Sequence, residues 1–321
     1  MQSNNAILTR EQAQAIVEKA IKRSKADAID VQVNTYTAGN IRFADNQVST
    51  AGSTTDGQLG IQSFFGARHA VVTTNDFSDD SIARAVAESE RLARLAPEDP
   101  ENMPQLAAQQ YAPVNAWFDS TANLSAEDRA KAALSALDIA RKAGDLKAAG
   151  YLVTTAGALA IGNSTGMFAY HRSTNANYTL TVRTTDGTGS GWAAADNADW
   201  AQLDARRVAE TASEKARLSR NPVAIEPGRY TVILEPQAVG DIVQLISQYA
   251  DARSADEGRS PFVKQGGGNK VGEKIMDERV TLFSDPSDPQ LQGRPWDFEG
   301  MPLGRQVWIE NGVLKQLIYS R

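Results

Sequence analysis

The sequence predicts an α+β protein in which antiparallel sheets are flanked by helices. Helical periodicity, with capping residues ahead of it, recurs in four places along the chain. Between those places the apolar residues repeat with a period of two, and turn residues separate the resulting short runs. These observations together favour helices packed on antiparallel strands.

The first predicted module covers residues 1–96 and runs helix, sheet, helix. Thr9 and Gln12 form a capping-box pattern ahead of an amphipathic helix, and Ser78 begins a second helix that stops before Pro97. Between the helices the alternation of Ile29, Val31 and Val33 opens an antiparallel meander. Its further strands are expected at Asn40–Ala44, Gln47–Ala51, Gly57–Phe65 and Arg68–Thr74, with turns at Ala38–Asn40, Asp45–Asn46, Asp56–Gly57 and Gly66–Ala67.

A proline-rich segment, residues 97–123, is predicted to be a linker or an extended wrapping segment. The central α+β module follows at residues 124–222. Ser125 caps its first helix, two strands are expected at 150–162 and 167–184 with a turn at Ser173–Asn175, and a last helix begins at Asp199.

The third predicted module, residues 223–321, combines a short buried strand at Tyr230–Leu234 with a helix from Pro236. Three later strands are expected at Val280–Phe283, Gln306–Ile309 and Val313–Tyr319. Asn311-Gly312 predicts a tight hairpin between the last two. Because the chain stops directly after that hairpin, we expect this module to be incomplete.

Composition narrows the function classes. The 321 residues include no cysteine and only two histidines, His69 and His171, which makes a metal site of nitrogen and sulfur ligands improbable and excludes disulfides and thiol nucleophiles. The net charge of −6 and the lack of a basic cluster argue against a nucleic-acid partner. Met1–Asn5 does not resemble a signal peptide and no long apolar window occurs, so we expect a cytoplasmic protein without a membrane partner.

Several segments resemble one family. Three lie in the third module, at Tyr230–Pro236, Trp296–Met301 and Ile309–Leu314; others lie at Asn40–Asn46, Gly57–Gly60, His171–Ser173 and Asp186–Trp192. Their order and spacing resemble the TldD/TldE family, also called PmbA, whose peptide-processing members were once described as gyrase modulators. The resemblance covers nearly the whole chain.

The resemblance implies a metal-dependent peptidase built from two kinds of subunit. The active kind carries a His-Glu-x-x-x-His helix, in which the histidines bind zinc and the glutamate acts as general base. In this chain the three positions read Gln244, Leu245 and Tyr249, and the family's third ligand, a cysteine, has no counterpart. The resemblance therefore implies a TldE-like, non-catalytic subunit without a metal or other cofactor of its own. Zinc is expected in a TldD-like partner subunit.

The local pattern also bears on these positions. On an ideal helix, residues 244 and 249 lie about 140° apart, so two ligands there converge only where the helix is distorted or ends. Periodicity places Gln244 on the polar face and Tyr249 on the apolar stripe of a helix expected to reach Ala250. The pattern predicts an ordinary helix without a metal.

Other candidates are weaker. His171, Arg172, Arg183 and Trp192 are hypothesised to contact substrate, since they lie on or beside the strands of the central module. Gly187–Gly191 would suit a phosphate but lacks the lysine of a P-loop, and a flexible strand-to-helix connection is the preferred interpretation. Asp251, Asp256 and Glu257 offer oxygen ligands, although an acidic loop neutralised by nearby arginines explains them better.

The sequence thus predicts a subunit that helps to enclose the partner's metal and holds an unfolded or extended peptide; a homodimer also stays open. Two alternatives remain. One is a self-sufficient hydrolase that uses carboxylates such as Asp241, Asp251 or Glu257. The other is a peptide-binding scaffold without enzymatic activity.

Overall fold

The computed structural model describes residues 7–321, so the expectation about Met1–Asn5 falls outside the described residues. The chain divides into two compact units. Unit 1 holds the residues up to Val223 together with Asp288–Pro302, and unit 2 holds Ala224–Ser287 with Leu303–Arg321. Each unit is an α+β arrangement with antiparallel strands.

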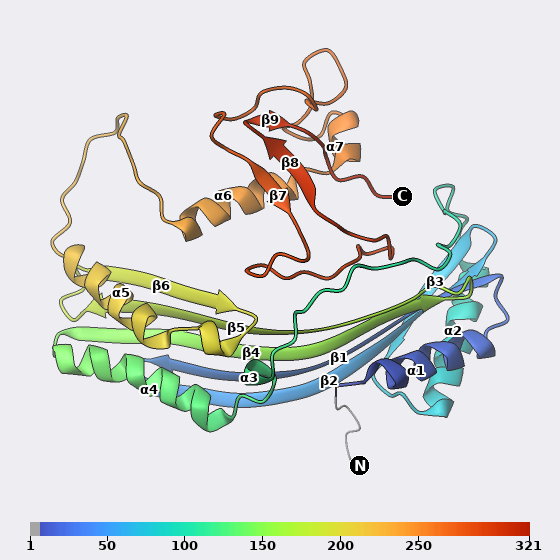
Figure 1. The fold of residues 1–321 in the computed structure, drawn as a ribbon, viewed down its shortest axis with the longest axis horizontal. Helices are drawn as coiled ribbons and strands as arrows, with labels where there is room; N and C mark the ends of the chain where they lie inside the picture. The colour runs from blue at the N-terminus through green and yellow to red at the C-terminus, as the bar shows by residue number, and fades with distance from the viewer. Residues whose placement is uncertain (1–6) are drawn as a thin grey trace. The chain divides into compact units, whose positions relative to one another are not determined.

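Unit 1 is built on one antiparallel sheet of six strands in the order β3-β2-β1-β4-β5-β6. The strands are β1 (Ala28–Ala44), β2 (Gln47–Phe65), β3 (Arg68–Thr74), β4 (Leu146–Asn163), β5 (Phe168–Thr184) and β6 (Ser190–Asn197). β1 pairs with β4 from Asp30↔Asn163 to Phe43↔Gly150. Strands from the first two predicted modules therefore lie in a single sheet (Figure 1).

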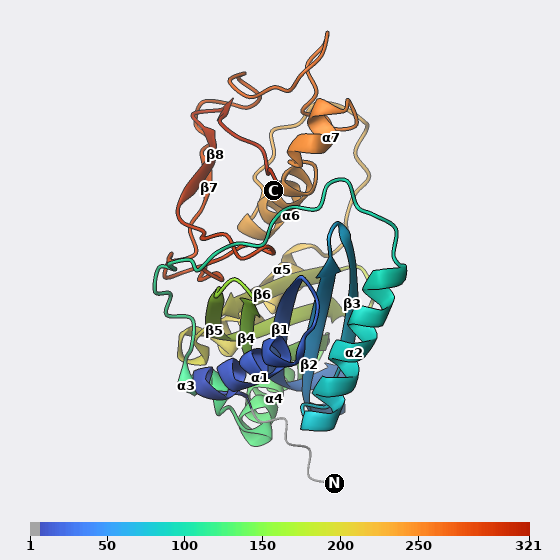
Figure 2. The same ribbon diagram turned by 90° about the vertical axis from the view of Figure 1, so that its right-hand side faces the viewer.

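Four helices cover one face of this sheet. They are α1 (Arg10–Arg23), α2 (Asp79–Leu95), α4 (Ala126–Ala143) and α5 (Ala205–Leu218). Along β1 the odd-numbered residues point to this face: Ile29 packs in the core beneath α1 and α2, while Phe43 packs in the core beneath α4 and α5. The pairs α1/α2 and α4/α5 cover opposite ends of the sheet (Figures 1 and 2), so the two hydrophobic cores lie side by side beneath them.

Even-numbered residues of β1 point to the opposite face, on which the described residues of unit 1 place no helix. We call this surface the open face. Its side chains are mostly polar or aromatic and are exposed or half-buried: Tyr36, Asn40, Arg42, Tyr151, Thr155, Asn175, Asn177 and Trp192. The strand register places all of them on one side of the sheet.

The helix caps predicted at Thr9, Ser78 and Ser125 are confirmed, and the helix start predicted at Asp199 is wrong. Thr9 accepts a hydrogen bond from the backbone of Gln12, and the Gln12 side chain accepts one from the Thr9 backbone N–H, which completes the capping box. Ser78 and Ser125 are the N-cap residues of α2 and α4. Each side chain accepts a hydrogen bond from the backbone N–H three residues later. Asp199 caps only a short 3₁₀ helix, η1 (Trp200–Gln202), and α5 begins afterwards with Asp204 as its cap.

Two of the four turns predicted in the meander are wrong. Turns occur at Asp45–Asn46 and Gly66–Ala67, but β1 and β2 run straight through Gly39 and Gly57. At Gly39 a Cβ would overlap the guanidinium of Arg129, and at Gly57 it would approach the ring of Phe77 to 2.7 Å. These glycines make room for side chains from the helix-bearing side rather than reversing the chain.

In the central module, the turn and the connection predicted from sequence also differ from the structure. The turn expected at Ser173–Asn175 is absent, because β5 pairs continuously with β4 through these residues. Gly187 lies in the hairpin between β5 and β6, with a φ of 76°, instead of in a strand-to-helix connection. At Gly189 and Gly191 a Cβ would overlap backbone carbonyls of α5, so these glycines let β6 and the helix pack closely.

The segment between the modules has one short helix, α3 (Asp119–Ala122). Ahead of α3 it lies extended along unit 1. The Leu106 carbonyl accepts a hydrogen bond from the Asn163 side chain at 2.8 Å, and Ala116 forms a parallel bridge with Ser173 at the edge of β5. This bridge holds the neighbouring Trp117 beside β5.

Unit 2 contains α6 (Pro236–Gln248), α7 (Ala252–Asp256) and a sheet of β7 (Leu282–Ser284), β8 (Gln306–Glu310) and β9 (Val313–Leu314). The Asn311-Gly312 hairpin is confirmed, with φ values of 49° and 77°, although β9 is shorter than the predicted strand. The core of the unit gathers small and large apolar side chains: Ala252, Ala255, Phe262, Ile309, Leu314 and Leu317.

The strand predicted at Tyr230–Leu234 is wrong. These residues are assigned to no strand, and Ile233 is 98% exposed. An apolar run becomes a strand only when another strand satisfies its backbone hydrogen bonds, and no described segment pairs with this one. Within residues 7–321, no helix is both long enough and apolar enough to cross a membrane.

Candidate functional site

The positions to which the resemblance assigns the zinc motif lie at the end of α6 in unit 2. Gln244 and Leu245 belong to the last two turns of the helix, and Tyr249 is its C-cap residue. All three side chains are exposed, Leu245 by 56% and Tyr249 by 53%. Where the resemblance implies a zinc site, this chain therefore exposes an amide, an alkyl and a phenol side chain.

Helix α6 ends at Gln248, so Tyr249 is its C-cap residue and not part of a continuing apolar stripe. The backbone N–H of Tyr249 donates to the carbonyls of Ile246 and Ser247, and Tyr249 has φ −98° and ψ 0°. The prediction that position 249 continues a regular helix is therefore wrong, and the angular argument against two converging ligands does not apply. What distinguishes the site from a zinc site is side-chain chemistry: a neutral amide is a weak ligand and leucine takes no proton.

Acidic residues near α6 have other partners. Asp251 caps α7 by accepting from the Ser254 N–H at 2.7 Å, and Glu257 pairs with Arg253 at 2.9 Å and with Arg259. Asp256 accepts a hydrogen bond from Asn269. Among residues 7–321, no three His, Cys, Asp or Glu side chains are grouped as metal ligands.

These partners also affect basicity. Hydrogen bonds from Ser254 hold the pKa of Asp251 below its usual value, and hydrogen bonds from Arg253 and Arg259 do the same for Glu257. A lowered pKa weakens a carboxylate as a general base. Asp251 and Glu257 are therefore weak candidates for the general base of a hydrolase.

The two histidines do not meet. His69 on β3 contacts the side chains of Gln62 and Asp99 at 3.0 and 3.1 Å, whereas His171 lies on β5. Three strands separate β3 from β5, which corresponds to about 19 Å at the usual strand spacing. A site that shares both imidazoles is excluded.

His171 lies beside a small cavity on the open face of unit 1. The cavity has a volume of about 190 Å³, and its walls include Asn34, Ser173 and Arg294. Burial lowers the pKa of His171, and the nearby positive charge of Arg294 lowers it further. The imidazole is therefore held toward its neutral form, in which it can accept or donate a hydrogen bond.

Sequence reasoning missed the loop that closes this cavity. Trp296 is 1% exposed and packs on Ile161, Met167 and Ala169, with the ring of Tyr111 at 5.3 Å. The motif Trp296–Met301 shapes the loop: Asp297 accepts from the N–H groups of Glu299 and Met301, and Gly300 has φ 93°. In the sequence this motif contributes only to the family resemblance; its tryptophan is a residue type that often packs in a core, but nothing local showed which unit it joins.

The other predicted substrate contacts do not form one site with His171. Arg183 and Trp192 are exposed on the open face, but Arg183 lies twelve residues further along β5. Twelve residues of a strand span about 40 Å. These side chains belong to opposite ends of a long surface.

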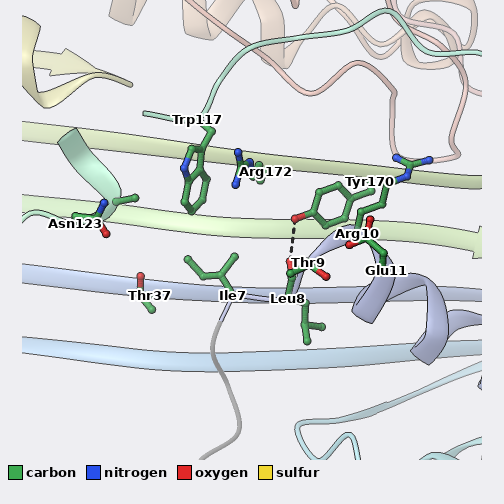
Figure 3. Close-up of a pocket in the computed structure, with 11 residues that line it drawn as sticks. Ile7, Leu8, Thr9, Arg10, Glu11, Thr37, Trp117, Asn123, Tyr170 and Arg172 are labelled. Carbon is green, nitrogen blue, oxygen red and sulfur yellow. Dashed lines mark hydrogen bonds between the residues drawn. The ribbon is translucent and has the colours of Figure 1, made fainter. Parts of the chain in front are cut away.

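Arg172 faces the opposite way from His171, because neighbouring strand residues alternate between faces. It lies at the gap between the two helix pairs, in a pocket of about 560 Å³. Its guanidinium carbon is 4.6 Å from the centroid of the Trp117 ring, and Tyr170 forms another wall (Figure 3). The pocket and the open face are thus on different sides of the same sheet.

Three family models match the chain. Residues 29–93 match domain 1, residues 119–220 match the central domain and residues 227–321 match the C-terminal domain of the PmbA/TldA metallopeptidases. Curated relatives include a metalloprotease from Methanothermobacter thermautotrophicus, 32% identical over 117 residues, and one from Archaeoglobus fulgidus, 32% identical over 104 residues. These stretches cover 36% and 32% of the chain but only 24% and 23% of the relatives.

Solved structures share the fold. TldE from Thermococcus kodakarensis aligns with a TM-score of 0.82 at 18% identity, over 96% of this chain and 69% of that one. A candidate modulator of a DNA gyrase from Thermotoga maritima aligns with a TM-score of 0.85 at 16% identity, over 96% of this chain and 71% of that one. At such identities the agreement concerns the fold, which is the α+β arrangement predicted from the sequence.

Proposed function

Because this chain belongs to the PmbA/TldD metallopeptidase family, we propose that it is a subunit of a two-component peptidase whose metal is bound by the other component. The residues at Gln244, Leu245 and Tyr249 carry this proposal. They supply neither the two imidazoles nor the carboxylate that a zinc-activated water requires.

The partner that fits is a TldD-like chain with a complete His-Glu-x-x-x-His helix and bound zinc. Assembly with such a chain supplies the metal and the general base. This chain then contributes walls to the chamber and surface to hold the substrate. Peptide maturation or breakdown is the process that this division of labour serves.

The test compares the purified chain with the reconstituted pair. Zinc content is measured after dialysis, and hydrolysis of unfolded peptides is followed for each protein alone and for the mixture. We expect substoichiometric zinc and no hydrolysis from this chain, and activity from the mixture that exceeds that of the partner alone. One zinc per chain, together with hydrolysis by this chain alone, contradicts the proposal.

The open face of unit 1 is the surface we assign to substrate. An extended peptide offers backbone amides along its whole length, and the open face offers side-chain amides such as Asn40 beside exposed aromatic rings such as Tyr36 and Tyr151. Aromatic side chains give large contact areas at low entropic cost, and amides adapt to either donors or acceptors. The surface therefore suits peptides of varied sequence.

Binding of a labelled unfolded peptide, followed by fluorescence anisotropy, tests this assignment. Tyr36→Ala and Tyr151→Ala are each expected to weaken binding by about fivefold or more, since a buried aromatic contact contributes over about 1 kcal/mol. Leu95→Ala is the control, because Leu95 is 71% exposed on α2, away from the open face. Equal binding by all three variants contradicts the assignment.

The same experiments separate the alternatives. A scaffold without enzymatic activity predicts peptide binding but no gain of hydrolysis with any TldD-like chain. A self-sufficient hydrolase predicts activity without a partner that Asp241→Asn, Asp251→Asn or Glu257→Gln abolishes. The lowered pKa values of Asp251 and Glu257 favour the two-component peptidase over that hydrolase.

A further inference from the structure

Besides the cavity beside His171, a larger pocket lies on the helix-bearing side of unit 1, on the other side of the sheet from the open face. It occupies the gap between the start of α1 and the short helix α3, above β1 and β5 (Figure 3). Its volume of about 560 Å³ is within the range of about 300–1,000 Å³ typical of small-molecule sites. Nothing in the proposed peptidase role uses it.

The walls of this pocket are mostly apolar and are held in place. The Tyr170 hydroxyl donates to the Leu8 carbonyl at 2.8 Å, which fixes the phenol ring against the segment before α1. Trp117 is anchored by its indole N–H, which donates to Asp119 at 2.9 Å, and by the bridge of Ala116 to β5. Both rings are thus preorganised walls, which reduces the entropic cost of binding.

Arg172 gives the pocket its polar specificity. Its guanidinium stacks on the Trp117 ring, and among residues 7–321 it forms no ion pair. A stacked guanidinium keeps its N–H groups in the plane of the fork, where they match the two oxygens of a carboxylate. The geometry therefore favours a planar, bidentate anion.

The remaining charges distinguish a carboxylate from a phosphate. Arg10 and Glu11 also line the pocket and carry opposite charges, and the first turn of α1 is already capped by the Thr9 side chain. With Arg10 and Glu11 offsetting each other, Arg172 leaves one net positive charge, which balances a monoanion better than a dianionic phosphate. A single negative charge attached to an apolar group fits these surroundings better.

We propose that this pocket binds a carboxylate adjoining an apolar side chain, as found at the C-terminus of a peptide or in a free N-acyl amino acid. The carboxylate pairs with Arg172, and the apolar group packs between Trp117 and Tyr170. All residues that line this site belong to unit 1 of this chain, and the open face lies on the other side of the sheet, so the site can be tested on the chain alone.

Calorimetric titration with matched acids and amides tests the proposal. The probes are N-acetylphenylalanine and a hexapeptide ending in phenylalanine, each as the free acid and as the amide. The wild-type chain is expected to bind each acid about tenfold or more tightly than its amide, as a charge-assisted hydrogen bond implies. A tighter hexapeptide identifies a peptide C-terminus as the ligand, and a tighter N-acetylphenylalanine identifies a free derivative; either supports the shared chemistry.

Substitutions locate the effect. Arg172→Gln is expected to remove the preference for the acid, and Trp117→Ala to weaken acid and amide alike. Arg91→Gln is the matched control, because Arg91 is an exposed arginine on α2 that pairs with Glu88 and lies outside both the pocket and the open face. Near-ultraviolet circular dichroism confirms that each variant is folded. The proposal is overturned by equal binding of acid and amide, by no binding, or by an equal loss in Arg172→Gln and Arg91→Gln.

Discussion

The imidazole of His171 meets the indole of Trp296 edge to face, with ring centroids 6.0 Å apart and ring planes at 87°. Residue 171 belongs to a central strand of the six-stranded sheet, and residue 296 belongs to a loop that the sequence assigns to a different module. The contact joins a titratable group to the largest fully buried side chain of the protein. It has consequences for both pH dependence and stability.

The first prediction concerns acidification. Burial, assisted by Arg294, lowers the pKa of His171 in the folded chain below its ordinary value of 6.5. The unfolded chain therefore takes up this proton at a higher pH than the folded chain does. The stability that His171 contributes is complete above about pH 6.5 and is lost as the pH falls toward the lowered pKa.

Denaturant unfolding at pH 7.5 and 5.5 measures this loss. His171→Gln should lose less free energy of unfolding between the two values than the wild type. Ser173→Ala changes a non-titratable wall of the same cavity and keeps His171, so it should behave as the wild type does in this comparison. If His171→Gln is as sensitive to acid as the wild type, the inferred direction of the pKa shift is wrong.

The second prediction concerns the anchor of the returning loop. Trp296→Ala removes a side chain that is 1% exposed and packs on β4 and β5. We expect the free energy of unfolding to fall by about 3–5 kcal/mol. Phe298→Ala is the control: Phe298 is 96% exposed and only stacks on Arg294, so the expected cost is under about 1 kcal/mol. Similar costs for both variants would show that Trp296 is not an anchor.

The third prediction concerns the close approach of β6 and α5. A methyl group at Gly191 would overlap the Ala212 carbonyl, so Gly191→Ala must displace the helix. We expect a destabilisation of about 1–3 kcal/mol. Gly52→Ala on β2 has open space, with its nearest contact at 3.9 Å, and should change stability by less than about 0.5 kcal/mol. Thermal unfolding of the two variants provides the comparison.

The fourth prediction concerns the positions of the zinc motif. Gln244→Ala, Leu245→Ala and Tyr249→Ala change exposed side chains and, on the proposed function, remove no ligand. Each is expected to leave the peptidase rate of the reconstituted pair within about twofold, or less than about 0.5 kcal/mol of activation free energy. Replacing the glutamate of the partner's motif is the positive control. A loss in this chain's variants equal to that of the control would assign them a catalytic role.

Local features could be predicted from the sequence because their causes are local. The capping box of Thr9 and Gln12 involves two residues of one turn, and the Asn311-Gly312 hairpin needs only residues that adopt positive φ. Alternation along β1 showed which residues share a face. The absence of cysteine and the residue types at positions 244, 245 and 249 can be read directly from the sequence.

Non-local pairing decided the rest. Gly39 and Gly191 are typical turn residues in sequence, but each allows a close approach by a helix distant in the chain. No local pattern predicts that β1 pairs with β4, which places two predicted modules in one sheet. The opposite orientations of His171 and Arg172 follow from alternation, but which face each one meets depends on where the helices pack.

The sequence by itself determined the fold class, the starts of the helices capped by Thr9, Ser78 and Ser125, and the residue types at positions 244, 245 and 249, because these follow from residue type and short-range periodicity. Only the tertiary structure showed that α6 ends at Gln248, that Trp296 returns to His171 and that Arg172 faces a pocket. Each of these depends on contacts between residues far apart in the chain. Such contacts are selected by packing and backbone hydrogen bonding across the whole unit, which no short window of sequence contains.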